Sequence, residues 1–399
     1  MRVLMLNNEF PPLGGGTGVV NYHLLKELAH DPEIVVDLVT SSRTRATYEQ
    51  EQFAARINIY KVPVDNQNIH HSSNSELLRY TWRGLAYCRR LMRANRYDLS
   101  FAFAGVPAGA MSYVLHLTSG LPYIVSLQGP DVPGFEARYN YLYPILKPLL
   151  RRVWRKAHTV LAISREHRDL ALRTLPNLTI PIIYNGVETD LFTPGVEASS
   201  TLRLLCVGRL IERKGQQHLL RAFAQLRAYP NAPALSLTLV GTGDNEAALR
   251  RLADELQIAN AVTFTGFVSR EAMPAVYRQA DIFVLPSQSE GMSIALLEAL
   301  SAGLPVVVTA TGGTEELVTP GENGLVVAWA DVVGLTTALQ HLIAAPQLRK
   351  AMGAKSRACA CSLAWSAITQ QFVEVMRRVV AQSTVVGVQV GVSKASHEE

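Results

Sequence analysis

The sequence predicts an α/β protein of two domains, each built on a parallel sheet with helices on both faces. Short apolar runs alternate with segments of helical period along most of the chain, and this alternation is typical of doubly wound parallel sheets. The chain has 399 residues, which is too long for one ordinary core, so two domains of roughly 150–200 residues each are expected. An apolar content of 48% with 18% charged residues argues against disorder.

The first alternation predicts a domain at residues 1–190. Strands are predicted at residues 2–7, 34–40, 99–104, 123–127 and 159–163. Helices are predicted at residues 20–29, 77–95 and 146–156. Residues 43–74 are expected to be variable loops. The uncharged stretch 99–130 suggests a membrane span, but its glycines and prolines favour strand, helix and strand instead.

A turn-rich stretch begins at Asn185, and a linker is expected at residues 191–201, before a second domain at residues 202–364. Its predicted strands are residues 202–207, 235–240, 262–265, 282–285, 306–309 and 325–327. Its predicted helices are residues 216–226, 245–256, 270–278, 293–301, 335–344 and 347–361. A last helix is expected at residues 365–382, where it could cross back to the first domain, and a mobile tail at residues 383–399.

The net charge is +5, and the whole excess lies in the first 190 residues. An anionic partner is therefore expected for that half. Nucleic acid is not favoured, because no zinc-finger, RNA-binding or helix-turn-helix pattern is present. Cys359 and Cys361 lack a second pair at metal-ligand spacing and are interpreted as incidental. Few cysteines and a very short first apolar run fit a cytoplasmic protein without a signal peptide.

Two glutamates eight residues apart, Glu290 and Glu298, are the strongest indication of function. A helix is expected to begin near Ser293, so Glu290 precedes it and Glu298 lies about one turn inside. Eight helical residues would separate the two by roughly 12 Å. The backbone N–H groups of residues 291–294 lie between them and favour an anion. This arrangement would suit a ligand with hydroxyls at both ends and phosphates in the middle. A nucleotide-sugar is such a ligand. The alternative is an amphipathic helix with two solvated glutamates.

A glycine loop, Gly14-Gly15-Gly16, follows the first strand and opens the first helix. It does not match the G-x-G-x-x-G fingerprint, which disfavours a nicotinamide oxidoreductase, and no Gly-Lys-Ser/Thr follows it. The loop can approach a phosphate or a sugar closely, because glycine has no side chain to block the approach. The alternative is a tight turn between strand and helix.

Two cations, Arg209 and Lys214, come just after the first strand of the second domain. A guanidinium and an ammonium together suit a diphosphate. They would also stabilise the charge that grows on a departing diphosphate.

Taken together, these motifs resemble those of the retaining glycosyltransferases of family 4, which have the GT-B fold of two Rossmann-like domains facing across a cleft. The resemblance runs in order from residue 1 to about residue 380. Its further motifs are Asn185-Gly-Val-Glu, Val240-Gly-Thr-Gly, Phe264-Thr-Gly-Phe-Val, Ala280-Asp, Pro286-Ser and Gly312-Gly.

The resemblance implies roles for several of these residues. Glu298 would hold the ribose hydroxyls, Glu290 the donor sugar, and Arg209 with Lys214 the diphosphate. The other implied contacts are the N–H groups at Gly291, Met292, Ser293 and Ile294 for sugar and phosphate, Val268 for the base, and Gly15 and Gly16 for the diphosphate. It also implies no metal and no cofactor, with the nucleotide-sugar as co-substrate.

One position departs from the family pattern, because Gln128 stands where many relatives carry histidine. An amide can only hydrogen-bond at neutral pH, so Gln128 is expected to orient the donor sugar and not to act as a base. The leaving diphosphate is then the expected base. Asp131 is a second polar candidate for substrate binding, and its alternative role is that of a turn residue.

The expected activity is transfer of a hexosyl group, from a UDP-sugar, to a hydroxyl of a lipid-linked, polysaccharide or other glycan acceptor. The Arg-rich helices predicted at residues 77–95 and 146–156 could contact an anionic membrane on its inner face, or could be ordinary solvated helix faces. Three alternatives remain: a nucleotide-sugar epimerase, a phosphorylase, and a non-catalytic nucleotide-sugar binder.

Overall fold

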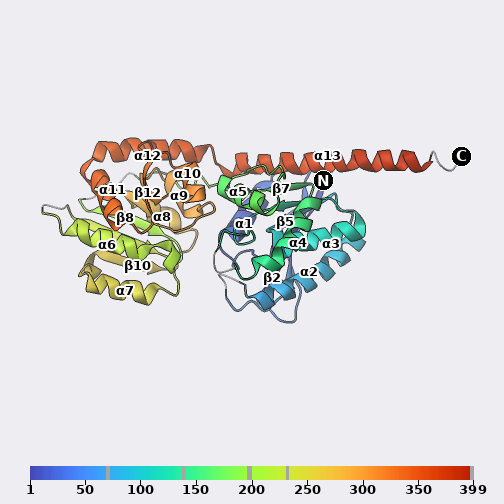
Figure 1. Ribbon diagram of the computed structural model, residues 1–399, viewed down its shortest axis with the longest axis horizontal. Coiled ribbons are helices and arrows are strands. Elements are labelled where there is room, and N and C mark those ends of the chain that lie inside the picture. The colour runs from blue at the N-terminus through green and yellow to red at the C-terminus, as the bar shows by residue number, and fades with distance from the viewer. Residues whose placement is uncertain (69–71, 137–139, 196–199, 231–232, 396–399) are drawn as a thin grey trace. The chain divides into compact units, whose positions relative to one another are not determined.

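The computed structural model describes residues 1–68, 72–136, 140–195, 200–230 and 233–395. The chain forms two compact units (Figure 1): unit 1 contains Met1–Tyr184 and Trp365–Glu399, and unit 2 contains Asn185–Ala364. The boundary lies at residue 185, earlier than the predicted residue 190. The Val187 N–H donates to the Leu363 carbonyl, and Glu188 pairs with Arg270 at 2.8 Å, so this stretch packs within unit 2.

Unit 1 is built on a sheet with the strand order β3-β4-β2-β1-β5-β6-β7. All neighbouring strands are parallel except β3 and β4, which are antiparallel. The strands are β1 (Arg2–Leu6), β2 (Val35–Ser42), β3 (Glu49–Ala54), β4 (Ile57–Pro63), β5 (Leu99–Phe103), β6 (Tyr123–Ser126) and β7 (Thr159–Leu161). The chain moves outward from β1 on one side and from β5 on the other, so the sheet has a topological switch point between β1 and β5.

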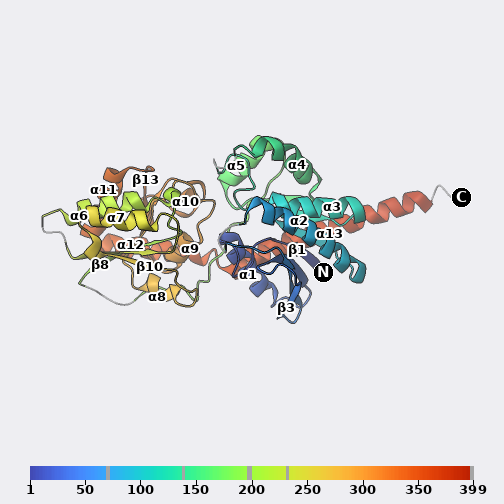
Figure 2. The same ribbon diagram turned by 90° about the horizontal axis from the view of Figure 1, so that it is seen from below.

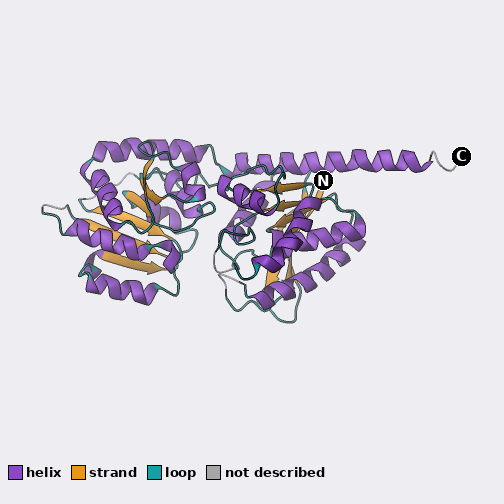
Figure 3. Ribbon diagram, viewed as in Figure 1, coloured by secondary structure: helices purple, strands orange, loops and turns teal. Residues whose placement is uncertain are grey.

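The helices of unit 1 flank this sheet, as Figure 3 shows. They are α1 (Gly16–Leu28), α2 (Asn74–Ala94), α3 (Ala110–Ser119), α4 (Tyr143–Lys156), α5 (Arg165–Thr174) and α13 (Trp365–Ala395). Ser73 and Glu76 form a capping box that starts α2. Helix α2 packs on α3, and α3 packs on α4 (Figure 2). The predicted order of strand, helix and strand over residues 99–130 is confirmed, with β5, α3 and β6.

Three features of unit 1 differ from the sequence predictions. Residues 43–74 contain β3 and β4 in place of loops. Strand β3 begins with the exposed polar repeat Glu-Gln-Glu-Gln and so lacks an apolar run, whereas β4 is largely buried and was missed. Helix α5 was not predicted. Helix α13 continues to Ala395, beyond the predicted end at residue 382, in a valine-rich stretch without proline. Residues 396–399 of the expected tail, and residues 196–199 of the expected linker, lie outside the described residues.

Unit 2 has a fully parallel sheet with the strand order β10-β9-β8-β11-β12-β13. The strands are β8 (Leu202–Val207), β9 (Leu235–Val240), β10 (Val262–Gly266), β11 (Ile282–Leu285), β12 (Val306–Thr309) and β13 (Gly324–Val327). The helices are α6 (Gln216–Arg227), α7 (Glu246–Glu255), α8 (Met273–Arg278), α9 (Ile294–Ser301), α10 (Gly312–Leu317), α11 (Val332–Ala344) and α12 (Pro346–Cys361). The short helix α10 was not predicted.

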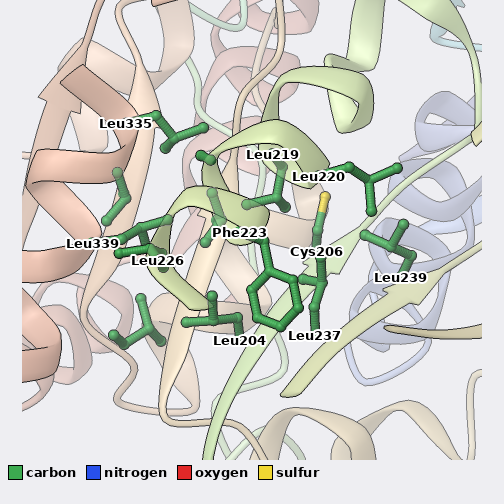
Figure 4. Packing of buried hydrophobic residues seen from close by; sticks show 14 of the residues in the cluster. Leu204, Cys206, Leu219, Leu220, Phe223, Leu226, Leu237, Leu239, Leu335 and Leu339 are labelled. Carbon is green, nitrogen blue, oxygen red and sulfur yellow. The ribbon is translucent and has the colours of Figure 1, made fainter. Parts of the chain in front are cut away.

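One core of unit 2 lies between the sheet and helices α6 and α11 (Figure 4). Leu204 and Cys206 of β8 face Phe223 of α6, and Leu339 of α11 closes the layer. Cys206 is buried, which confirms its prediction as a small core residue. Over the residues that the structure describes, the model contains no helix that combines the length and apolar character needed to cross a membrane.

Candidate active site

The site of unit 2 lies at the carboxyl ends of β8 and β11. These strands are neighbours in the sheet, although β9 and β10 separate them in the chain. The chain therefore builds outward in both directions from this pair, which makes it the topological switch point where open α/β sheets bind ligands. The loop after β8 carries Arg209 and Lys214, and the loop after β11 carries Glu290. The fold thus places the loops that carry these three predicted site residues after neighbouring strands.

A buried ion pair joins the two loops. Lys214 Nζ lies 2.5 Å from Glu290 Oε1, and the Glu290 residue is only 8% exposed. Burial acts to raise the pKa of Glu290, but the charge and hydrogen bond of Lys214 outweigh it, and the pKa lies below its ordinary value. Glu290 is therefore an ionised carboxylate. An ammonium has three N–H donors, so Lys214 can contact a phosphate while it remains paired.

The β8 loop is fixed against β11 by close backbone packing. Gly215 has a φ of +73°, and a Cβ built there would lie 1.9 Å from the Pro286 carbonyl oxygen, so only glycine fits. The Arg213 guanidinium donates to the Ser289 carbonyl at 3.2 Å, next to Glu290. The Arg209 carbonyl accepts a 3.0 Å hydrogen bond from the Gln216 amide, which anchors that end of the loop. These contacts fix the positions of Lys214 and Glu290 relative to each other.

Helix α9 begins as predicted. Ser293 is its N-cap, and the Ser293 hydroxyl accepts a hydrogen bond from the Leu296 N–H at 3.3 Å. The Ile294 N–H is among the first N–H groups of the helix, which have no acceptor within the helix. Glu290 lies in the loop before α9 and Glu298 inside it, as the sequence predicted. The helix start is therefore an anion-favouring element between two carboxylates.

The turn before α9 is held from two sides. The Asn185 amide donates to the Met292 carbonyl at 3.4 Å, and the Asn185 N–H points at the Met292 sulfur at 3.3 Å. A Cβ at Gly313 would lie 2.0 Å from the Gly291 carbonyl oxygen, so α10 packs directly on this turn. The motifs at residues 185–188 and 312–313, for which the sequence predicted no role, therefore position the N–H groups of residues 291–294.

The second glutamate of the motif lies in a different environment from the first. Glu298 is 9% exposed, and its Oε2 accepts a hydrogen bond of 2.8 Å from the Tyr277 hydroxyl. Burial raises the pKa of Glu298 to about 7, although Tyr277 and the charge of Arg270 act in the opposite direction. Both glutamates are thus buried, and the alternative interpretation of two solvated glutamates was wrong.

The predicted base contact, Val268, lies in the loop between β10 and α8 and is half-buried. Strand β10 is at the edge of the sheet, two strands away from β8. Its role as a base contact stays a prediction.

The glycine loop of unit 1 lies at the corresponding switch point of the other sheet, after β1. A Cβ built at Gly15 or at Gly16 would meet no atom within 4 Å. No steric reason within unit 1 therefore requires glycine at these two positions, whereas Gly14 has a φ of +97° and packs on Glu9. The Gly15 N–H donates to Glu9 Oε2 at 3.1 Å. The interpretation as a tight turn accounts for Gly14 but not for Gly15 and Gly16.

Asp131 and Gln128 lie together in the loop after β6. Asp131 Oδ2 accepts from the Gly105 N–H at 2.8 Å, and Oδ1 accepts from the N–H groups of Gln128 and Gly129. Burial raises the pKa of Asp131 above its ordinary value, against the effect of these N–H groups. These hydrogen bonds support the alternative role of Asp131, that of a turn residue. The Gln128 side chain is partly exposed and donates to Ser126 Oγ at 2.8 Å.

Three residues of the site carried no prediction of their own. Tyr277 holds Glu298, Asn185 holds the turn before α9, and Arg213 holds the loop of Glu290. Asn185 could have been found, because it lies in a motif of the resemblance. Tyr277 lies 21 residues from Glu298 on a separate helix, and no local spacing indicates their contact.

Among the residues that the structure describes, no three or more His, Cys, Asp and Glu side chains cluster where they could hold a metal ion. Cys359 and Cys361 are both free thiols.

Comparison with known families identifies the class of protein. The model of glycosyl transferases group 1 matches residues 190–358, and the model of glycosyltransferase family 4 matches residues 14–191. The two matches cover unit 2 and most of unit 1. The chain therefore belongs to the family 4 glycosyltransferases and has the GT-B fold.

Particular proteins are similar over most of this chain and of their own length, and one matches over about half. A GDP-mannose-dependent alpha-(1-6)-phosphatidylinositol monomannoside mannosyltransferase of Mycolicibacterium smegmatis is 29% identical, over 89% of this chain and 92% of that protein. A D-inositol 3-phosphate glycosyltransferase of Corynebacterium jeikeium is 35% identical, over 47% of this chain and 49% of that protein. Sucrose-phosphate synthase of Thermosynechococcus elongatus has a similar structure, with a TM-score of 0.81, 22% identity and coverage of 96% and 100%.

Proposed function

We propose that this glycosyltransferase moves a hexosyl group from a nucleoside diphosphate sugar to an acceptor hydroxyl, with retention of the anomeric configuration and without a metal ion. The observation that carries the proposal is the buried Lys214–Glu290 pair at the switch point of unit 2. It places a cation for phosphate and an ionised carboxylate for hydroxyls beside the start of α9, with Glu298 further along the same helix.

Each group of this site has a distinct task. Glu290 accepts hydrogen bonds from hydroxyls of the donor sugar, and Glu298 from those of the ribose. The N–H groups from Gly291 to Ile294 contact sugar and phosphate. Arg209 and Lys214 bind the diphosphate and stabilise the negative charge that grows as it departs. Because this charge grows only during bond cleavage, the two cations favour the transition state over the bound donor.

The chemical step needs a base for the acceptor hydroxyl. The bond between the anomeric carbon and the diphosphate oxygen breaks, and the acceptor oxygen forms a bond to the same face of that carbon. The acceptor proton passes to the departing diphosphate, which takes the place of a side-chain base. Gln128, as an amide, orients the sugar by hydrogen bonding. Gly15 and Gly16, which have no side chains, let the backbone of their loop approach the diphosphate closely.

GDP-mannose is the donor that we propose in preference to the UDP-sugar expected from the sequence. The mycobacterial relative, similar over 89% of this chain, is named as GDP-mannose-dependent. The acceptor that we propose is a lipid-linked glycan of the inositol type, since that relative is named for a phosphatidylinositol monomannoside acceptor. A cytoplasmic location at the inner face of a membrane suits such an acceptor.

A thermal-shift screen with GDP, UDP, ADP and their sugars tests the donor. A bound ligand raises the unfolding temperature by mass action. We expect the largest shift from GDP and GDP-mannose. A larger shift from UDP would favour a UDP-sugar as the donor. No shift from any nucleotide would contradict a nucleotide-sugar site.

A transfer assay tests the activity itself. Radiolabelled GDP-mannose is incubated with phosphatidylinositol mannoside, with EDTA present, and product is followed by chromatography. We expect Glu290→Gln to lower turnover by at least about a hundredfold, since it removes an ionised partner of the donor sugar. Glu255→Gln, an exposed residue of α7, is the matched control. Equal turnover in both variants would show that Glu290 is not in the site.

The same assay separates the other classes of function. An epimerase would change the donor sugar without an acceptor. A phosphorylase would require inorganic phosphate and would show the absorbance of a pyridoxal cofactor. A non-catalytic binder would give a thermal shift but neither transfer nor slow hydrolysis of the donor over hours.

A further inference from the structure

The two carboxylate oxygens of Glu298 have different surroundings. Oε2 accepts a hydrogen bond of 2.8 Å from the Tyr277 hydroxyl. Among the residues that the structure describes, none donates a hydrogen bond to Oε1. Glu298 is largely buried, and buried polar groups are normally paired with a donor or an acceptor. The asymmetry therefore leaves Oε1 for a hydroxyl that a ligand supplies.

Tyr277 is fixed in the core of unit 2 by its aromatic neighbours. Its side chain is fully buried, and its ring centroid lies 5.4 Å from that of Phe192 and 6.0 Å from that of Phe283. The same hydroxyl lies 3.1 Å from the Ala295 carbonyl of α9. Burial raises the pKa of Tyr277 well above its ordinary value, and the charge of Glu298 acts in the same direction. The hydroxyl therefore keeps its proton and remains a hydrogen-bond donor.

A second group acts on Glu298 from the loop between β10 and α8. Burial is the largest influence on the pKa of Glu298 and raises it to about 7. The Tyr277 hydrogen bond and the charge of Arg270 lower this pKa, whereas the charge of Glu188 raises it. Arg270 itself pairs with Glu188 at 2.8 Å. These are the titratable and charged groups that act on Glu298, and they determine how much of it is ionised near neutral pH.

We propose that Tyr277 is a positioning residue for the nucleotide half of the donor: it holds Oε2 of Glu298, so that Oε1 accepts a ribose hydroxyl. Arg270 supports the same task, because its positive charge favours the ionised carboxylate. The inference rests on the proposed function, since the ribose belongs to the proposed donor. Neither residue is assigned a contact with the reacting atoms, so both act on the affinity for the nucleotide.

A purely structural role for Tyr277 is the alternative, in which its hydroxyl only satisfies a buried carboxylate. Loss of the hydroxyl would then weaken the binding of every nucleotide equally. A positioning role instead changes the preference for a ligand that has ribose hydroxyls over one that lacks them. This preference is the dissociation constant of 2′,3′-dideoxy-GDP divided by that of GDP. Both ligands carry the same base and diphosphate, so titration of the diphosphate cancels in the ratio.

Calorimetric titration of the full chain with the two ligands, from pH 5.5 to pH 9, measures this preference. At pH 8 the wild type should prefer GDP by at least about tenfold, since a site built to bind a hydroxyl rejects a ligand without it. The preference should decrease as the pH falls through about 7, where Glu298 gains its proton, because a carboxylic acid is a weaker acceptor than a carboxylate.

Three variants change the surroundings of Glu298 in known directions. Tyr277→Phe keeps the ring and removes the hydroxyl, so the preference at pH 7 should fall by at least about threefold. Its dependence on pH should also move to higher pH, because a hydrogen bond that lowers the pKa of Glu298 is lost. Arg270→Gln should move the profile in the same direction, and Glu188→Gln should move it to lower pH. General damage to the fold would not give opposite shifts from the two partners of one ion pair.

The matched controls are Tyr229→Phe, just after α6, and Arg251→Gln on α7, both at exposed positions of unit 2. Both should keep the preference and the pH profile of the wild type. Unfolding temperatures without ligand show which variants fold, and Arg270→Gln, at a partly exposed residue, tests the proposal even where Tyr277→Phe does not fold. An unchanged profile in the site variants, or equal weakening of both ligands, would overturn the proposal.

The result is separable from that of the transfer assay. A protein that transfers the sugar but binds GDP and 2′,3′-dideoxy-GDP alike would contradict this inference and leave the proposed function in place. A protein whose variants shift the preference as expected, but which transfers no sugar, would support the positioning role of Tyr277 and contradict the proposed function.

Discussion

Lys214 Nζ lies 2.5 Å from Glu290 Oε1, although the two residues are 76 positions apart in the chain. Adjacent parallel strands bring their loops together at the switch point of the sheet of unit 2. The pair is buried, so each charge depends on the other for its stability. The same two side chains are those that the proposed function assigns to the diphosphate and the donor sugar.

Removing one of the two charges of this pair should destabilise unit 2. Lys214→Met leaves Glu290 buried without its cation, and we expect a loss of about 3–5 kcal/mol in the free energy of unfolding. The double variant K214M/E290Q should recover much of that loss but none of the transfer activity, because it removes the buried charge and both functional groups. Urea denaturation measures the stability, and Lys350→Met is the exposed control. A single variant as stable as the control would contradict a coupled, buried pair.

The raised pKa of Glu298 predicts a pH dependence of stability. Burial raises the pKa of Glu298 in the folded protein to about 7, above its ordinary value, so the folded state holds this proton more tightly than the unfolded state. Stability from this group is fully present below the unfolded pKa and falls as the pH rises toward 7, by at most about 3 kcal/mol.

Glu298→Gln checks that prediction, because an amide has no such proton to lose. Denaturation from pH 5 to pH 8 should show a smaller decrease for Glu298→Gln than for the wild type. Parallel curves for the two proteins would mean that Glu298 titrates normally. The contact that the proposed function assigns between Glu298 and the ribose should strengthen over the same pH range, because the ionised carboxylate is the better acceptor.

Gly215 and Gly321 test the close packing between the β8 loop and β11. Both have positive φ, of +73° and +83°, but a Cβ at Gly321 meets no atom within 4 Å, whereas one at Gly215 would overlap the Pro286 carbonyl. Gly321→Ala should cost about 1–2 kcal/mol for its backbone conformation alone. Gly215→Ala should cost at least about 1 kcal/mol more. Equal unfolding temperatures for the two variants would contradict the packing.

Substitutions in the glycine loop of unit 1 can distinguish an effect on stability from an effect on donor binding. Gly16→Ala adds a Cβ where no atom lies within 4 Å, so the free energy of unfolding should change by less than about 1 kcal/mol. Under the proposed function the donor KM should rise, because the added methyl group would hinder the approach of the diphosphate to the backbone. Gly14→Ala is the contrast, since it combines positive φ with a contact at Glu9 and should destabilise the unit. An unchanged KM in Gly16→Ala would assign the loop a purely structural role.

Local features of this protein were predictable, and the start of α9 is the clearest case. Ser293, the apolar spacing after it and the two glutamates all lie within a short stretch, so cap, helix and acidic positions followed from sequence alone. The parallel sheets followed from the alternation of apolar runs. Strand β3 could not be found this way, because its first four residues are polar and carry no apolar run; it pairs with β4, and Phe53 near its end packs against Phe10 and Tyr22.

Contacts between distant segments were not predictable in the same way. The adjacency of β8 and β11 determines that Lys214 meets Glu290, and strand order cannot be derived from the spacing of apolar residues. Asp131 shows the same limit, since its three backbone partners include Gly105, which is 26 residues away. The sequence therefore indicated the residue types of the site, while the fold determined which of them act as partners.

Calorimetric titration of GDP is the most direct test of the central claim, that the switch point of unit 2 binds a nucleoside diphosphate. Wild type should bind GDP in one site, and Glu298→Ala should weaken the affinity by at least about tenfold, a loss of about 1.4 kcal/mol. Glu255→Ala should bind as the wild type does. Unchanged affinity in Glu298→Ala, with GDP still bound, would place the nucleotide elsewhere and contradict the account.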